Sequence, residues 1–185
     1  MKHVLMLNGS PRPQGATQTV LSLLQTEFET AGHSCEIVRL SDCEINYCLG
    51  CKVCYETMQC VQRDGMDTLL EKMAHADVLV LASPSYWGDV TGQMKVFFDR
   101  CTPYCNAHTP HASLPGGKQG YAVALRTGPS AGECLHIIES IRHFYGHMGI
   151  ACCNNDAIHL CGIAQAHDIS NEQSGQLRRF ARSIT

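Results

Sequence analysis

Cysteine is the residue type whose number and spacing first suggest chemistry. The chain contains 12 cysteines in 185 residues, and several lie close together. Four of them, Cys48, Cys51, Cys54 and Cys60, form the pattern Cys-x2-Cys-x2-Cys-x5-Cys. Bacterial ferredoxins contain the same Cys-x2-Cys-x2-Cys run, in which each thiolate reaches a different iron of a cubane. The spacing therefore favours a four-iron cluster held by one loop.

Zinc is the main alternative for these four thiols, and a loop without metal is the other. Structural zinc sites more often use two separated Cys-x2-Cys pairs than a compact run of three. A second segment with ligand types, Cys101-x3-Cys105-x2-His108-x2-His111, matches no standard zinc spacing. The remaining cysteines show no pairing pattern. We therefore expect free thiols in a reducing compartment rather than a disulfide scaffold.

A second distinctive segment is Asn-Gly-Ser-Pro-Arg-Pro-Gln-Gly-Ala-Thr at residues 8–17. It joins a short apolar run to an amphipathic one, as a strand-to-helix loop does. Hydroxyls, small residues and the free amides of a helix N-terminus together favour a phosphate group. The alternative is an ordinary turn in which Thr17 caps the helix. The loop lacks the signatures of dinucleotide and nucleoside-triphosphate sites. The candidate ligands are Ser10, Arg12, Gly15, Ala16 and Thr17.

The turn after the third predicted strand is suited to one edge of an isoalloxazine ring. Tyr86 and Trp87, the only tryptophan, offer flat surfaces, and Gly88 lets main-chain groups approach closely. The alternative is that this aromatic pair closes the core. Another turn of small residues, at 127–128, follows the fourth predicted strand and is expected to face the same crevice. The candidate site residues of these two turns are Pro84, Ser85, Tyr86, Trp87, Gly88, Thr127 and Gly128.

The motifs lie between alternating apolar and amphipathic segments. Strands are predicted at 4–7, 34–40, 78–83, 120–126 and 150–160. Helices are predicted at 17–31, 66–76, 91–101, 130–148 and 169–184. This alternation predicts an α/β fold: a doubly wound, five-stranded parallel sheet of flavodoxin-like order 2-1-3-4-5, with helices on both faces. Polar residues in the second and fifth strands suggest edge positions. Ligands bind outside the carboxyl ends of such strands, where the loops with the motifs must meet.

Composition argues against several other classes of protein. A net charge of -3, a pI of about 6.3 and the lack of a basic tract exclude a typical nucleic-acid-binding protein. No apolar run is long enough to span a membrane, and the N-terminus lacks the features of a signal peptide. We expect a cytoplasmic protein. Its length predicts a single domain over 1–185, with a cysteine-rich insertion at about 43–60.

Three motifs, occurring in order over about residues 1–149, resemble the NAD(P)H-dependent FMN reductase superfamily and most closely its iron–sulfur flavoproteins. They are Gly9-Ser10-Pro11-Arg12…Gly15-Ala16-Thr17, the Cys48–Cys60 loop, and Ser83-Pro84-Ser85-Tyr86-Trp87-Gly88…Gly92-Gln93-Met94-Lys95…Asp99-Arg100. The resemblance implies that the first loop holds the FMN phosphate. It also implies that residues 84–88 and 127–128 hold the ring and that the four cysteines hold a [4Fe-4S] cluster. A homodimer or homotetramer is implied as well.

The resulting functional prediction is an FMN-dependent electron-transfer oxidoreductase. Electrons would pass between a donor such as ferredoxin, the cluster and FMN, which then reduces a small acceptor such as a quinone or an oxygen species. NAD(P)H is an alternative electron donor. No catalytic side chain is predicted, because the flavin carries the chemistry. One alternative is a cluster-free NAD(P)H-dependent FMN or quinone reductase. The other is a non-catalytic flavodoxin-like carrier or a zinc-stabilised binding protein.

Overall fold

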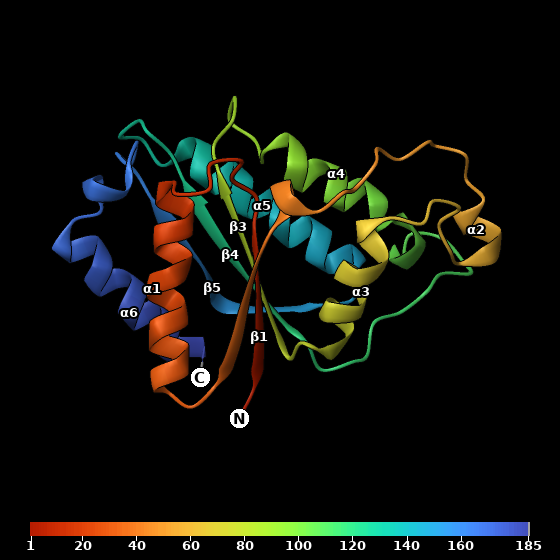
Figure 1. Ribbon diagram of the computed structural model, residues 1–185, viewed down its shortest axis with the longest axis horizontal. Coiled ribbons are helices and arrows are strands. Elements are labelled where there is room, and N and C mark those ends of the chain that lie inside the picture. The colour runs from red at the N-terminus through yellow and green to blue at the C-terminus, as the bar shows by residue number, and fades with distance from the viewer. Residues whose placement is uncertain (185) are drawn as a thin grey trace.

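The computed structural model describes residues 1–184, apart from the side chains of Cys153 and Asn154. Its centre is a parallel sheet of five strands in the order β2-β1-β3-β4-β5. The strands are β1 (His3–Asn8), β2 (Ser34–Arg39), β3 (Val78–Pro84), β4 (Gln119–Leu125) and β5 (Ala151–Leu160). Figure 1 shows that the start of β1 and the last turn of the C-terminal helix lie at the same end of the sheet. The sheet order predicted from the sequence is confirmed, including β2 and β5 at the edges.

Helices cover both faces of the sheet (Figure 1). One face packs against α1 (Ala16–Thr30) and α6 (Asn171–Ile184), and the other against α3 (Gly65–His75), α4 (Gly92–Arg100) and α5 (Gly132–His147). These bounds differ from the predicted ones by one or two residues at most ends. Short elements that the sequence did not predict are α2 (Cys54–Thr57) and the 3₁₀ turns Leu40–Asp42, Thr102–Tyr104 and Ala166–Asp168.

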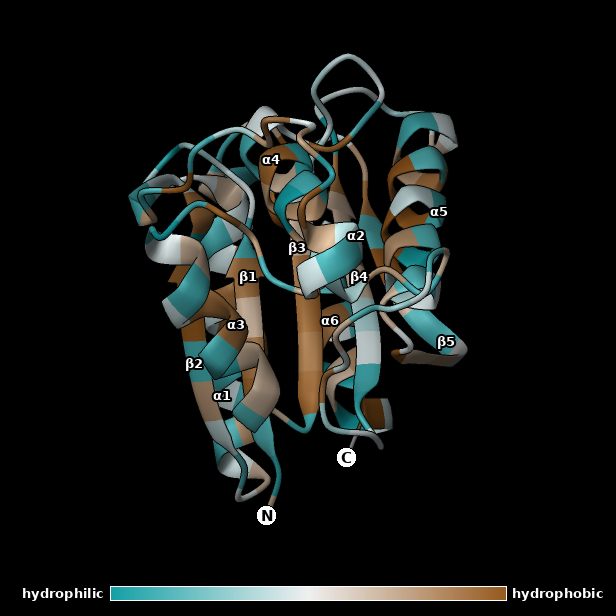
Figure 2. Ribbon diagram, turned by 90° about the vertical axis from the view of Figure 1, so that its right-hand side faces the viewer, coloured by the Kyte–Doolittle hydropathy of each residue, from teal (hydrophilic) through white to brown (hydrophobic). Residues whose placement is uncertain are grey.

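The central strand β3 is apolar on both faces, as its position between two helical layers requires. Each of the five residues from Val78 to Ala82 is at most 1% exposed, and Figure 2 shows this strand as continuously hydrophobic. Side chains alternate between the two apolar cores. Along β1, Val4 points to the core beneath α1 and α6, whereas Leu5 points to the core beneath α3, α4 and α5. This burial holds the carboxyl ends of the strands in a fixed arrangement.

The loop after β1 is tied to the start of α4. Thr91 caps α4 by accepting the amide of Met94 at 3.3 Å, and its hydroxyl donates to the carbonyl of Gly9 at 2.6 Å. The amide of Gly9 in turn donates to the carbonyl of Ala82 at 2.8 Å. Buried hydrogen bonds therefore anchor the loop after β1 to β3 and α4. Within residues 1–184, none of the helices has the length and apolar character needed to cross a bilayer.

Candidate functional site

One cavity of about 150 Å³ lies at the carboxyl ends of the strands, and we call it the strand-end cavity. It brings together nine of the 12 residues predicted to contact a flavin. These are Ser10, Arg12, Gly15, Ala16, Thr17, Pro84, Ser85, Tyr86 and Thr127. The other lining residues are Leu125, Arg126, Ile163 and Ala164. Loops that are far apart in the sequence therefore meet here, as the doubly wound topology requires.

The N-terminus of α1 forms one wall of the strand-end cavity. Gly15 is the N-cap, no side chain caps the helix, and its first turn contains no acidic residue. Thr17 lies inside the helix and is buried, so the alternative in which Thr17 caps the helix is wrong. A Cβ at Gly15 would lie 2.9 Å from the Cβ of Arg12, so the loop needs glycine there. Uncapped amides at the positive end of a helix dipole fit a phosphate group.

Ser10 shapes the loop that leads into this helix. Its amide donates to Asn8 Oδ1 at 2.9 Å, and its hydroxyl accepts the amide of Arg12 at 3.2 Å. Asn8 is held by its own side-chain bond to Gln18 Oε1 at 2.9 Å. Ser10 is only 3% exposed. The chain therefore turns sharply at Ser10 and presents Arg12 to the rim, where Nη1 donates to the carbonyl of Ala164 at 3.4 Å.

A polar network that the sequence did not predict forms another wall. Ser85 Oγ donates to Glu133 Oε2 at 2.5 Å, and Glu133 Oε1 pairs with Arg126 Nη2 at 3.2 Å. Arg126 Nη1 donates to the carbonyl of Ser130 at 2.7 Å, while its buried Nε has no hydrogen-bond partner. Arg126 thus places a positive charge at the carboxyl end of β4. A charged residue directly after a buried strand was the signal that could have identified it.

Three of the predicted flavin contacts, Trp87, Gly88 and Gly128, do not line the strand-end cavity. Trp87 and Gly88 form the tip of a tight turn with φ of 56° and 81°. Tyr86 is 43% exposed and Trp87 fully exposed, so the alternative that this pair closes the core is wrong. Gly128 lies behind Arg126, where a Cβ would be 2.5 Å from Nη2. Trp87 is therefore an exposed edge of the site, whereas Gly128 leaves room for Arg126.

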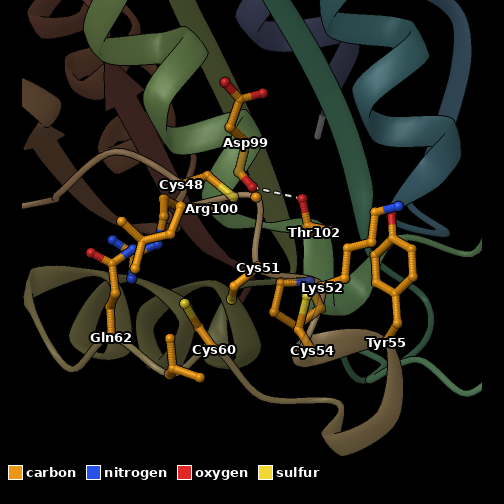
Figure 3. A pocket seen from close by; sticks show the side chains of 14 residues that line it. Cys48, Cys51, Lys52, Cys54, Tyr55, Cys60, Gln62, Asp99, Arg100 and Thr102 are labelled. Atoms are coloured by element: carbon orange, nitrogen blue, oxygen red, sulfur yellow. Dashed lines mark hydrogen bonds between the residues drawn. The ribbon is translucent and has the colours of Figure 1, made fainter.

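A second cavity, of about 170 Å³, lies between the cysteine-rich loop and the end of α4, and we call it the cysteine cavity. Cys48, Cys51, Cys54 and Cys60 all line it, and Figure 3 shows their side chains converging on one space. All four are free thiols. The rest of the lining is Leu49, Gly50, Lys52, Tyr55, Val61, Gln62, Asp99, Arg100, Thr102 and Pro103. The two cavities share no lining residue.

A buried ion pair anchors the cysteine-rich loop. Asp64 accepts Arg100 Nη1 at 2.6 Å and Nη2 at 3.1 Å, and the two side chains are 7% and 1% exposed. Asp64 also caps α3 through the amide of Met66 at 3.1 Å and accepts the amide of Asn46 at 3.0 Å. Burial acts to raise the pKa of Asp64, but these hydrogen bonds hold it well below its usual range. The pair therefore joins α4, α3 and the loop.

The four thiols interact electrostatically. Burial raises the pKa of Cys54, and the negative charges of Cys60, Cys48 and Cys51 raise it further. Among the described residues, no three His, Cys, Asp or Glu side chains are grouped to hold a single metal ion. One zinc ion would need its four sulfur ligands about 2.3 Å from a common centre, whereas a cubane spreads them over four irons. Four thiolates from one loop are the donor set that a cubane takes.

The second cysteine–histidine segment has a different role. Cys101 is buried among apolar residues, and burial raises its pKa well above the usual value. His108 stacks on Tyr55 of α2, with ring centroids 4.1 Å apart and an angle of 19° between the planes. Within the described part of the chain, this segment forms no metal-binding group. It instead packs against the cysteine-rich loop and supports it.

Solved structures with this architecture include several flavoenzymes. An NAD(P)H:quinone oxidoreductase from Methanothermobacter marburgensis superposes with a TM-score of 0.77 and 18% identity, over 99% of this chain and 96% of that one. RosB with a bound flavin intermediate superposes with a TM-score of 0.74 and 21% identity, over 100% and 80% of the two chains. At these identities the likeness establishes the flavodoxin-like fold.

Sequence comparison is more specific. An iron–sulfur flavoprotein of Archaeoglobus fulgidus is 41% identical over 128 residues, which are 69% of this chain and 56% of that protein. Another, from Methanocaldococcus jannaschii, is 33% identical over 153 residues, 83% of this chain and 77% of that protein. The chain thus spans little more than half of the first relative. Residues 2–164 match the family described as NADPH-dependent FMN reductase. The chain therefore belongs to the NADPH-dependent FMN reductase family.

Proposed function

We propose that the protein is an electron-transfer oxidoreductase of the iron–sulfur flavoprotein type, with FMN in the strand-end cavity and a [4Fe-4S] cluster in the cysteine cavity. The observation that carries the proposal is the convergence of four free thiols on one cavity, separate from the cavity that suits a flavin. The relatives named iron–sulfur flavoproteins support it.

In this proposal the uncapped N-terminus of α1 binds the FMN phosphate, assisted by the polar groups of the first loop. The phosphate ligands are Ser10, Arg12, Gly15, Ala16 and Thr17. The turns after β3 and β4 would hold the ring through Pro84, Ser85, Tyr86 and Thr127, with Trp87 and Gly88 at its exposed edge and Gly128 leaving room for Arg126. Arg126 supplies a positive charge and an unpaired donor at that end. Both favour the added negative charge of a reduced ring.

The cysteine cavity suits a cluster through its donors and its surroundings. Cys48, Cys51, Cys54 and Cys60 supply four thiolates, and Arg100 supplies a buried positive charge. FMN exchanges one or two electrons and a cluster exchanges one, so together they couple one-electron donors to two-electron acceptors. The side chains bind, orient and shield these groups, and no side chain acts as a catalytic acid or base.

Ferredoxin or NAD(P)H is the proposed donor, and a quinone or an oxygen species the proposed acceptor. A solved neighbour named NAD(P)H:quinone oxidoreductase supports the nicotinamide and quinone alternatives. A homodimer or homotetramer is proposed because both cavities are bordered by exposed apolar residues. These are Tyr47, Leu49, Val53, Tyr55, Met58 and Val61 near the cysteine cavity, and Tyr86 and Trp87 near the other.

The test is purification without oxygen, followed by iron, sulfide and flavin assays and a visible spectrum. We expect one FMN per chain, with about four iron and four sulfide per chain, as [4Fe-4S] requires. FMN without iron would overturn the cluster and leave the cluster-free reductase, which rapid bleaching of the flavin by NADPH would then support. Zinc without flavin would instead support the binding-protein alternative.

A further inference from the structure

Arg100, at the end of α4, is a buried charge in the wall of the cysteine cavity. Its side chain is 1% exposed. It lines the cysteine cavity and also a smaller neighbouring cavity of about 70 Å³, and Cys60 lines both of these as well. Arg100 and Cys60 therefore lie together at the boundary between the two cavities. Burial of a charge is costly, so a buried arginine normally has all its donors paired.

The donors of Arg100 are only partly paired. Nη1 donates to Asp64 Oδ2 at 2.6 Å and to the carbonyl of Asn46 at 2.8 Å, and Nη2 donates to Asp64 Oδ1 at 3.1 Å. These bonds fix the plane of the guanidinium group. Nε is buried and has no hydrogen-bond partner. The bonds to Asp64 and Asn46 therefore pair Nη1 and Nη2 but leave the buried Nε–H without an acceptor.

Cys60 lines the same two cavities as Arg100, so its sulfur is the candidate acceptor for the unpaired Nε–H. A thiolate or a cluster sulfide accepts an N–H bond readily, whereas a neutral thiol is a weak acceptor. The unpaired donor is thus suited to the charged form of Cys60 that binds iron.

We infer that Arg100 is a positioning residue whose Nε–H is held for the Cys60 sulfur and raises the reduction potential of the cluster. The inference rests on the proposed function, because it needs the cluster to be present. Reduction adds one electron from the donor to the cluster and forms or breaks no covalent bond. A fixed positive charge and a hydrogen bond to sulfur stabilise the extra negative charge, and they do so most strongly where water is excluded.

The test compares the midpoint potential of the cluster in the wild type and in variants, by EPR-monitored redox titration of the reconstituted protein. Arg100→Gln, which removes the charge and the Nε–H, should lower the potential by a tenfold or larger change in the reduction equilibrium, about 59 mV for one electron. Arg100→Lys keeps the charge without the fixed donor and should give a smaller decrease. Asp64→Asn keeps the guanidinium group and removes its counter-charge, so the potential should rise.

Lys52 provides the matched control, because it is a cation that lines the same cavity but is exposed. Lys52→Gln should shift the potential much less, since exposed charges are screened. If Arg100→Gln does not fold, the inference is tested by the other two variants, since Arg100→Lys should lower the midpoint potential and Asp64→Asn should raise it. A purely structural role predicts lower cluster content with an unchanged potential, and that result would overturn the inference alone. A wild type that takes up no iron and sulfide would overturn the proposed cluster as well.

Discussion

The two cavities are built in different ways. The strand-end cavity takes its walls from segments at residues 10–17, 84–86, 125–127 and 163–164, which the sheet topology brings together. The cysteine cavity takes most of its lining from residues 48–62 and the rest from the end of α4 and the 3₁₀ turn that follows it. The first is therefore a consequence of the whole fold. The second belongs to one loop, which the fold anchors mainly through the buried pair of Arg100 and Asp64.

This difference implies that the two sites can be lost separately. Hydrogen bonds from Gly9 to Ala82 and from Thr91 to Gly9 tie the first loop to β3 and α4, independently of the cysteine-rich loop. In contrast, among residues 48–60 the only regular element is the four-residue helix α2. A metal centre in a loop of this kind contributes to the order of the loop itself. Variants of each cavity test this separation.

The largest effect is expected for Cys51→Ala. Removal of one of four thiolates should abolish most of the iron and sulfide content and the broad visible absorption, while FMN remains bound. Iron and flavin assays on protein purified without oxygen provide the measurement. Cys105→Ala is the control, since Cys105 lies outside both cavities and should leave both contents unchanged. Loss of FMN together with iron in Cys51→Ala would show that the sites are not separable.

The next effect concerns stability. Asp64→Asn leaves the buried Arg100 without its counter-charge, and removal of one partner of such a pair costs about 3–5 kcal/mol. Urea unfolding of the cluster-free protein should show this loss. Asp99→Asn is the control, because its ion pair with Lys95 is exposed and worth about 0.3–0.5 kcal/mol. Similar losses in the two variants would contradict the central role given to the buried pair.

The same pair predicts a pH dependence. The pKa of Asp64 is lower in the folded protein than in the unfolded chain, where it is about 3.9. The ionised Asp64 side chain therefore contributes fully to the free energy of unfolding above about pH 4. This contribution is lost as the pH falls through the pKa of Asp64 in the folded protein. The difference in unfolding free energy between the wild type and Asp64→Asn should therefore shrink below about pH 4. Urea titrations from pH 7 to pH 3 measure it, and a constant difference would refute this assignment.

The parts that the sequence predicted are those encoded by local pattern. Periodic apolar segments identified all five strands, and the cysteine spacing identified four residues that do line one cavity. The buried pair was not predicted, because Asp64 and Arg100 are 36 residues apart and each looks like an ordinary surface charge in the sequence. The exposure of Trp87 was also not predicted, since a hydrophobic side chain alone does not indicate which way a turn points.

A smaller effect is expected for Gly128→Ala. The new Cβ would lie 2.5 Å from Arg126 Nη2, so that flexible side chain must move away from its place beside the strand-end cavity. FMN should bind about tenfold more weakly, which corresponds to about 1.4 kcal/mol. The measurement is a fluorescence titration of the apoprotein with FMN. Gly116→Ala is the control, because no atom lies within 4 Å of its Cβ position. Unchanged FMN affinity in Gly128→Ala would remove Arg126 from the flavin site.

The smallest effect is expected for Trp87→Ala. Trp87 is fully exposed at the tip of its turn, so its replacement should change the unfolding free energy by about 0.5 kcal/mol or less. If the ring packs on bound FMN, however, the affinity should fall by about 0.5–1.5 kcal/mol, as for other aromatic pairs. Because Trp87 is the only tryptophan, FMN should also quench the emission of the wild type.

Leu135→Ala is the matched control for this exposed aromatic residue. Leu135 is 51% exposed on α5 and lies outside the strand-end cavity, so its loss should affect neither quenching nor FMN affinity. An affinity of Trp87→Ala equal to that of the wild type, with no quenching, would mean that the flavin does not reach the turn. The strand-end cavity would then hold its ligand through buried and polar walls alone. The exposed indole of Trp87 would then be available for contact with another chain, as are the apolar residues around the cysteine cavity.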